Sequence, residues 1–201
     1  MINATALDSI IRKALQSFYT DISASAWCGR EREMVSFFVF SHIAPLCFPN
    51  SPLHLGQIGI EVAVRQLERD DLNPKRRPDV CKDLVIWPAP KMTLWTDWNR
   101  CNEPIAIMEW KVNHRFNMQQ HIESIEDSQD LDWLRQTAKR IGPSRTFLGY
   151  AVFVETECAP NRLSYVKVSM GAPDERISFP LSDQSTVSSG VRIPIVPDCG
   201  E

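Results

Sequence analysis

Residues 146–155 (TFLGYAVFVE) form the stretch that most constrains how this chain can fold. Between its polar ends the run is apolar nearly throughout, and its length suits a single strand. A strand that is apolar on both faces has to be covered by other parts of the chain on both faces. The stretch therefore predicts the central strand of a sheet that carries helices on its two sides.

Three other segments have the periodicity of helices. Residues 3–20 repeat apolar side chains at intervals of three and four, which predicts an amphipathic N-terminal helix. Residues 30–48 open with charged residues and become densely apolar, so their length favours a buried helix that ends near Pro45. A third helix is expected from Asp130 to residue 140, because a glycine and a proline follow it closely.

Four further strands are predicted from short apolar or alternating runs bounded by turn residues. They cover residues 58–67, 79–88, 104–112 and 162–170, the last as an edge strand. The resulting order of elements predicts an α/β fold with a mixed central β-sheet flanked by α-helices. We expect a single domain over residues 1–179, with residues 180–201 as a C-terminal extension or flexible tail.

Composition excludes several classes of function. With a net charge of -3 and a pI near 5.8, the chain is not coated in basic charge for non-specific binding to nucleic acids or membranes. No run approaches the ~18 apolar residues of a membrane span, and the N-terminus lacks the unbroken apolar core of a signal peptide. The six cysteines form no CxxC pair, unlike a zinc site. We therefore predict a soluble cytoplasmic protein.

The predicted strand over residues 104–112 runs from an apolar segment into Glu109, Trp110 and Lys111. Residues two apart in a strand share a face, so Glu109 and Lys111 project together and Trp110 points the other way. A strand suited to burial thus ends in two opposite charges on one face. An ordinary ion pair on the surface of a strand would have the same pattern. The residues of the neighbouring strand are therefore needed to tell such a pair from a functional site.

The apolar run that Asp83 opens supplies that neighbour. Antiparallel pairing of residues 84–87 with residues 105–108 brings Asp83 opposite Glu109. Two carboxylates at that separation repel each other unless a cation lies between them, and Mg²⁺ binds carboxylates, water and phosphate oxygens. Lys111 would lie beside a water bound to that ion. The pattern therefore predicts a magnesium site suited to phosphoryl chemistry.

Asp83 begins one apolar strand, and Glu109-Trp110-Lys111 end the next. This arrangement resembles the motif of the PD-(D/E)XK nuclease superfamily. This superfamily includes many restriction endonucleases and DNA-repair nucleases. Its core order of helix, three strands, helix and strand is similar to the order expected over residues 30–155. The resemblance implies a restriction-endonuclease-like core and Mg²⁺-dependent hydrolysis of DNA, with Mn²⁺ as a substitute ion. It makes Asp83 and Glu109 metal ligands and Lys111 the base that positions the water.

Alternatives remain at three points. Asp79, in a literal Pro-Asp pair, rivals Asp83 as a ligand, although Asp83 directly abuts the apolar strand. Members of the superfamily commonly carry a further acid on the first core helix, for which Glu31 is preferred over Glu33. His114, shortly after the motif, is a further candidate near the site.

Two basic groups are candidates for substrate binding: Lys75, Arg76 and Arg77 in one, Arg135 and Lys139 in the other. A solvated loop and a helix C-terminus would also collect such residues. No other segment resembles a DNA-reading module and 201 residues leave little room for one, so specificity in restriction, repair or defence would need a homodimer or a partner subunit. The alternative function is a catalytically inactive nuclease-fold protein that acts as a binding or assembly subunit.

Overall fold

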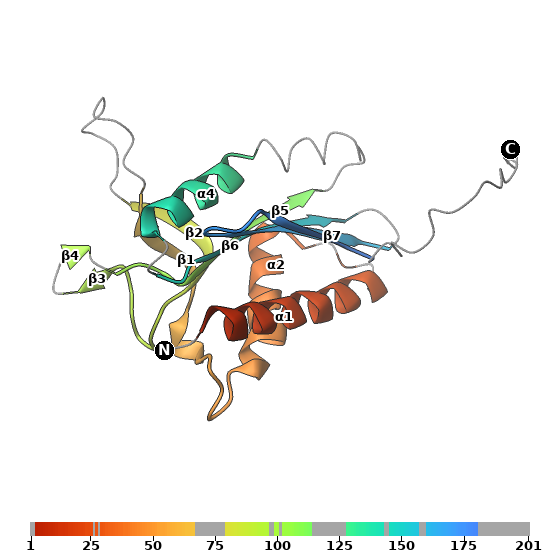
Figure 1. Cartoon of the computed structure of the whole chain (residues 1–201). Helices are drawn as coiled ribbons and strands as arrows, with labels where there is room; N and C mark the ends of the chain where they lie inside the picture. Colours follow the sequence, from red (N-terminus) through yellow and green to blue (C-terminus); the bar gives the residue numbers. More distant parts are fainter. Residues whose placement is uncertain are drawn as a thin grey trace, which may run out of the picture.

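The computed structural model describes residues 3–25, 27, 29–66, 79–96, 99–100, 102–113, 128–142, 145–156 and 160–180. A six-stranded sheet in the order β1-β2-β5-β6-β7-β8 lies at its centre. Its strands are β1 (Ile58–Arg65), β2 (Asp79–Ile86), β5 (Ala106–Asn113), β6 (Leu148–Glu155), β7 (Arg162–Ser169) and β8 (Glu175–Phe179). Figure 1 shows α1 (Ala4–Ala24) and α2 (Glu31–Phe37) on one face of the sheet and α4 (Gln129–Ile141) on the other.

The sheet is mixed. Its neighbouring strands run antiparallel except for β5 and β6, which are parallel. A parallel pair needs a crossover between its strands, and the chain that joins β5 to β6 contains α4. The predicted mixed α/β sheet flanked by helices is therefore confirmed.

The central strand predicted from residues 146–155 is β6, and all of its residues except the last are buried. Tyr150 packs in the cluster that includes α1 and α2, and Phe153 packs in the cluster that includes α4. Gly149 lets α4 approach closely, because a Cβ at this position would lie only 3.2 Å from the Cβ of Leu134. Coverage on both faces explains why the sequence of β6 lacks polar alternation.

The amphipathic helix expected over residues 3–20 is α1. It begins after Asn3, whose side chain accepts a hydrogen bond from the backbone N–H of Ala6 at 2.9 Å, and it continues to Ala24. Its buried stripe consists of Leu7, Ile11, Ala14, Leu15, Phe18 and Ile22. No helix in the described part of the chain is long and apolar enough to cross a membrane.

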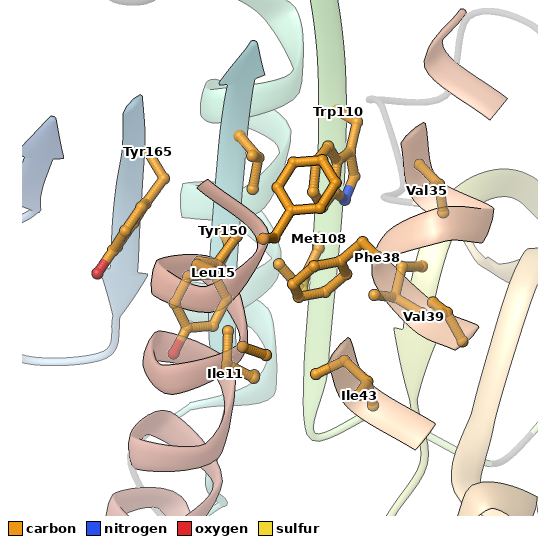
Figure 2. Packing of buried hydrophobic residues seen from close by; sticks show 14 of the residues in the cluster. Ile11, Leu15, Val35, Phe38, Val39, Ile43, Met108, Trp110, Tyr150 and Tyr165 are labelled. Carbon is orange, nitrogen blue, oxygen red and sulfur yellow. The ribbon is translucent and has the colours of Figure 1, made fainter. Parts of the chain in front are cut away.

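The segment expected as one buried helix over residues 30–48 changes type along its length. After α2 comes a π-helical turn at Phe38–Ile43 and then a 3₁₀ turn at Ala44–Leu46. Phe38 packs against Trp110 of β5 with ring centroids 5.1 Å apart (Figure 2). This packing fixes α2 beside the end of β5 that carries the predicted motif.

Two strand features were not expected from the sequence. The strand β7 is not an edge strand, because all five residues of β8 pair with it. Since β8 is short and two of its five residues are charged, it has no clear apolar pattern of its own. The insert between β2 and β5 contains a small hairpin of β3 (Trp95–Thr96) and β4 (Asn99–Arg100).

A partly buried cluster of charged side chains around Asp8 joins α1 to the sheet. Asp8 accepts hydrogen bonds from the Tyr150 hydroxyl at 2.6 Å and from Lys167 Nζ at 2.9 Å. Arg12 Nε donates to the same carboxylate at 3.0 Å. Burial is the largest influence and would raise the pKa of Asp8, but these hydrogen bonds together outweigh it and leave the pKa below its ordinary value.

Replacing Asp8 with Asn is expected to lower the free energy of unfolding by about 2 kcal/mol near neutral pH. Because its folded-state pKa is depressed, Asp8 stabilises the fold above its ordinary pKa of 3.8, and this contribution is lost as the pH falls through the lower folded value. The cost of the substitution should therefore shrink progressively below about pH 4. Urea unfolding at about pH 7 and about pH 3 measures this difference.

The exposed Asp132→Asn variant is the control for Asp8→Asn, and it should change the free energy of unfolding by less than about 0.5 kcal/mol at either pH. A cost of Asp8→Asn that is equal at both pH values would contradict a role for the Asp8 charge.

Candidate functional site

The strands β2 and β5 pair in the register that the sequence predicted. The ladder consists of three pairs, the last of which joins Leu84 to Met108. Asp83 does not continue the ladder, and its carboxylate instead accepts a hydrogen bond from the backbone N–H of Trp110 at 2.8 Å. The two strands therefore separate at the level of Asp83.

The alternation of β1 is interrupted at Glu61. Ile58 and Ile60 pack against the cluster that includes α1 and α2, whereas Val62 and Val64 belong with the cluster that includes α4. Residues two apart in a regular strand share a face, so β1 turns over between Ile60 and Val62. Glu61 lies between them with a φ of 51°, in the left-handed region that is costly for residues other than glycine.

The partner strand β2 turns over at the same level. The β1–β2 ladder has no pair between Glu61 and Asp83, and Val80 beyond this break packs in the α4 cluster. As a result Lys82, not Asp83, contacts Glu109. The structure differs here from the expectation that Asp83 faces Glu109, because that expectation assumed unbroken alternation along β2.

Glu109 forms a buried ion pair with Lys82. Their exposed fractions are 6% and 5%, and Lys82 Nζ contacts Glu109 Oε1. The same ammonium lies 3.9 Å from the centroid of the Trp133 ring on α4. Burial raises the pKa of Glu109 to about 8, against the opposing effect of Lys82. Glu109 is therefore engaged by Lys82 within the core.

Asp83 and Glu31 line one cleft of about 220 Å³ between α2 and the β1–β2 pair. The other lining residues are Arg30, Arg32, Val35, Ile60 and Glu61. Lys111 Nζ lies 3.8 Å from Glu31 Oε2 and 3.2 Å from Asp130 Oδ2 of α4. Lys111 thus contacts acids from helices on opposite faces of the sheet, and one of these acids lines the cleft with Asp83.

Negative charge is concentrated around Lys111. Burial raises the pKa of Glu31, and the nearby carboxylates, which include Asp83 and Asp130, raise it further against the attraction of Lys111. For Lys111, burial would lower the pKa, but Asp130 and Glu31 outweigh it and raise the pKa above its ordinary value. The surrounding acids therefore keep the Lys111 ammonium charged.

The two alternative acids do not line this cleft. The exposed Glu33 accepts a hydrogen bond from the backbone N–H of Arg30 at 2.7 Å, which satisfies a free donor at the start of α2. Asp79 lies at the far end of β2, opposite Arg65 of β1. At the rise of a strand, this position is about 13 Å from Asp83. The cleft therefore combines Glu31 and Asp83 from the candidate acids.

The predicted basic residues are not gathered at the cleft in the described part of the chain. Arg135 binds Asp174 at 2.8 Å and Asp132 at 3.0 Å. Lys139 is exposed in the last turn of α4, at the opposite end of that helix from Asp130. Four predicted candidates lie outside the described residues, namely Lys75, Arg76, Arg77 and His114.

Sequence reasoning missed five charged residues of this region: Arg30, Arg32, Glu61, Lys82 and Asp130. Lys82 turns inward only because of the break at Glu61, which alternation does not reveal. Asp130 lies in the first turn of α4, where acids are common because of the helix dipole, so its residue type and position did not mark it as a site residue. Arg30 directly precedes Glu31, and that adjacency was the one available sign.

Among the described residues, no group of three or more His, Cys, Asp or Glu side chains is arranged to hold a metal ion. The chain matches no protein-family model, no curated protein and no solved structure. The site therefore has to be interpreted from its own geometry and chemistry.

Proposed function

We propose that the chain is a metal-dependent nuclease that hydrolyses DNA phosphodiester bonds and has a restriction-endonuclease-like core. The order α2, β1, β2, β5, α4, β6 supports this proposal, since it follows the helix, three strands, helix and strand of the PD-(D/E)XK superfamily. In a restriction, repair or defence system, sequence specificity would come from a homodimer or from a partner subunit.

One observation carries the proposal: Glu31, Asp83 and Lys111 come together from three different elements. Asp83 and Glu31 line the same cleft, and Lys111 lies 3.8 Å from Glu31. Two acids and an ammonium beside a cleft are the groups needed to bind a cation and to stabilise charge on a phosphate.

Of the acids at this site, Glu31 and Asp83 suit a Mg²⁺ ion, whereas Glu109 does not in its present position. Mg²⁺ is commonly held by one or two carboxylates, with water and phosphate completing its shell. Burial and the neighbouring carboxylates raise the pKa of Glu31, and a cation between Glu31 and Asp83 would relieve this crowding. These two residues would hold the ion, whereas Glu109 would first have to be released from Lys82. When bound, Mg²⁺ or Mn²⁺ polarises a phosphoryl oxygen and acidifies a water molecule.

Lys111 would orient the attacking water and offset the negative charge that develops on the phosphate. Glu31 and Asp130 restrict the position of its ammonium from two sides. The pKa of Lys111 is raised despite its partial burial, which favours this electrostatic role over that of a general base near neutral pH.

Cleavage assays test the proposal directly. Wild-type protein is expected to cut plasmid or single-stranded DNA with Mg²⁺ or Mn²⁺ and to stop when EDTA is added. Lys111→Ala removes a half-exposed ammonium and should lower the rate at least about a hundredfold with little change in stability. Lys13→Ala, an exposed change on α1, serves as the control. Full cleavage by Lys111→Ala would remove Lys111 from the mechanism.

The alternative is a catalytically inactive nuclease-fold protein that acts as a binding or assembly subunit. The burial of Glu109 against Lys82 favours it, because a metal ligand predicted from the motif is already neutralised by a protein cation. Calorimetric titration with Mn²⁺ separates the two functions. Metal binding with DNA cleavage supports the nuclease, while wild-type protein that neither binds metal nor cleaves DNA or RNA supports the alternative.

A further inference from the structure

The cleft that contains Glu31 and Asp83 is lined by basic residues as well as acids. Arg30 and Arg32 line it together with three acids, Glu31, Glu61 and Asp83. A polyanionic strand would be repelled by carboxylates alone, so its approach depends on positive charge at the mouth of the cleft. The two arginines are the basic residues among those that line this cleft.

The two arginines differ in their availability. Arg32 Nε is bound to the Glu61 carboxylate, so its charge is already balanced. The backbone N–H of Arg30 donates to Glu33, but its guanidinium makes no ion pair or hydrogen bond with any other residue in the described part of the chain. Arg30 is also exposed. It therefore presents an uncommitted guanidinium next to Glu31.

A guanidinium in this position suits a phosphodiester. Its planar set of donors binds phosphate oxygens through two parallel hydrogen bonds, and it stays charged at any physiological pH. Arg135, by contrast, is engaged by Asp132 and Asp174, which removes it as a competitor for the same role.

We propose that Arg30 binds a backbone phosphate of the nucleic-acid strand, next to the phosphate that is cleaved, and so holds the strand across the cleft. This inference rests on the proposed nuclease function. Because the contact is to phosphate, it does not depend on base sequence. Arg30 would contribute to substrate binding, while Glu31, Asp83 and Lys111 act on the reacting group.

The test measures binding of a fluorescent oligonucleotide by anisotropy in the presence of EDTA, so that the strand stays intact. Arg30→Gln is expected to weaken binding about fivefold and to make the slope of log K against log salt concentration less negative by about one. Arg30→Lys should restore most of the slope. In cleavage assays with Mg²⁺, Arg30→Gln should raise KM and leave kcat nearly unchanged.

Lys13→Gln removes the same charge from the exposed surface of α1 and is the matched control. Equal effects of Lys13→Gln and Arg30→Gln would mean that only the overall charge of the protein matters, and this would overturn the inference. An unchanged affinity and salt slope in Arg30→Gln, with wild-type protein that binds and cleaves DNA, would overturn the inference alone. Wild-type protein that neither binds nor cleaves nucleic acid would overturn the proposed function as well.

Discussion

Asp83→Asn should reduce DNA cleavage at least about a hundredfold and change the free energy of unfolding by less than about 1 kcal/mol. Asn keeps a side-chain oxygen that can accept the hydrogen bond from the Trp110 N–H, so the separation of β2 from β5 is preserved. It lacks the negative charge that a divalent cation needs in the cleft shared with Glu31. Initial rates with Mg²⁺ and urea unfolding measure the two effects separately.

Asp79→Asn is the matched control, since it makes the same change on the same strand. Asp79 lies opposite Arg65, at the end of β2 that is remote from the cleft, so near-wild-type cleavage is expected. Loss of cleavage in Asp79→Asn with normal rates in Asp83→Asn would reverse the assignment of the two acids.

Lys82→Ala should lower the free energy of unfolding by about 3 kcal/mol. The substitution leaves Glu109 buried without its partner and removes the aliphatic stem of a side chain that is itself buried. It also removes the contact between the ammonium and the Trp133 ring, which is 3.9 Å from Nζ to the ring centroid. Urea unfolding monitored by tryptophan fluorescence measures the change.

A double variant separates charge from packing in this pair. Lys82→Met with Glu109→Gln removes both charges and keeps side chains of similar length, so it should be more stable than Lys82→Ala. A loss of less than about 1 kcal/mol in Lys82→Ala would mean that Lys82 and Glu109 do not form a buried pair.

Most of the helices and strands and one register were predictable because their signals are local. The apolar run of β6 and the alternation of Ile58 and Ile60 in β1 predicted strands that the structure contains. Pairing of the apolar ends of β2 and β5 gave the Leu84–Met108 register, since only one register joins the two apolar runs level with each other. The short strand β8 was missed because its residues carry too weak a pattern.

The partners of the charged residues were not predictable in the same way. Regular alternation assigns Asp83 to the face of Glu109, but the left-handed backbone of Glu61 and the missing Glu61–Asp83 pair reverse both strands at that point. Lys82 is thereby directed to Glu109. A single residue with an unusual φ has no sequence signature when it is not glycine or asparagine.

The sequence by itself therefore determined the layered α/β architecture, the order of its elements and the strand end at which acids and Lys111 accumulate. Only the tertiary structure decided which of these groups meet. Glu31 and Asp130 reach Lys111 from helices on opposite faces of the sheet, and Glu109 is withdrawn into the core by Lys82. Periodicity describes one element at a time, whereas these contacts depend on how the helices pack and where β1 and β2 turn over.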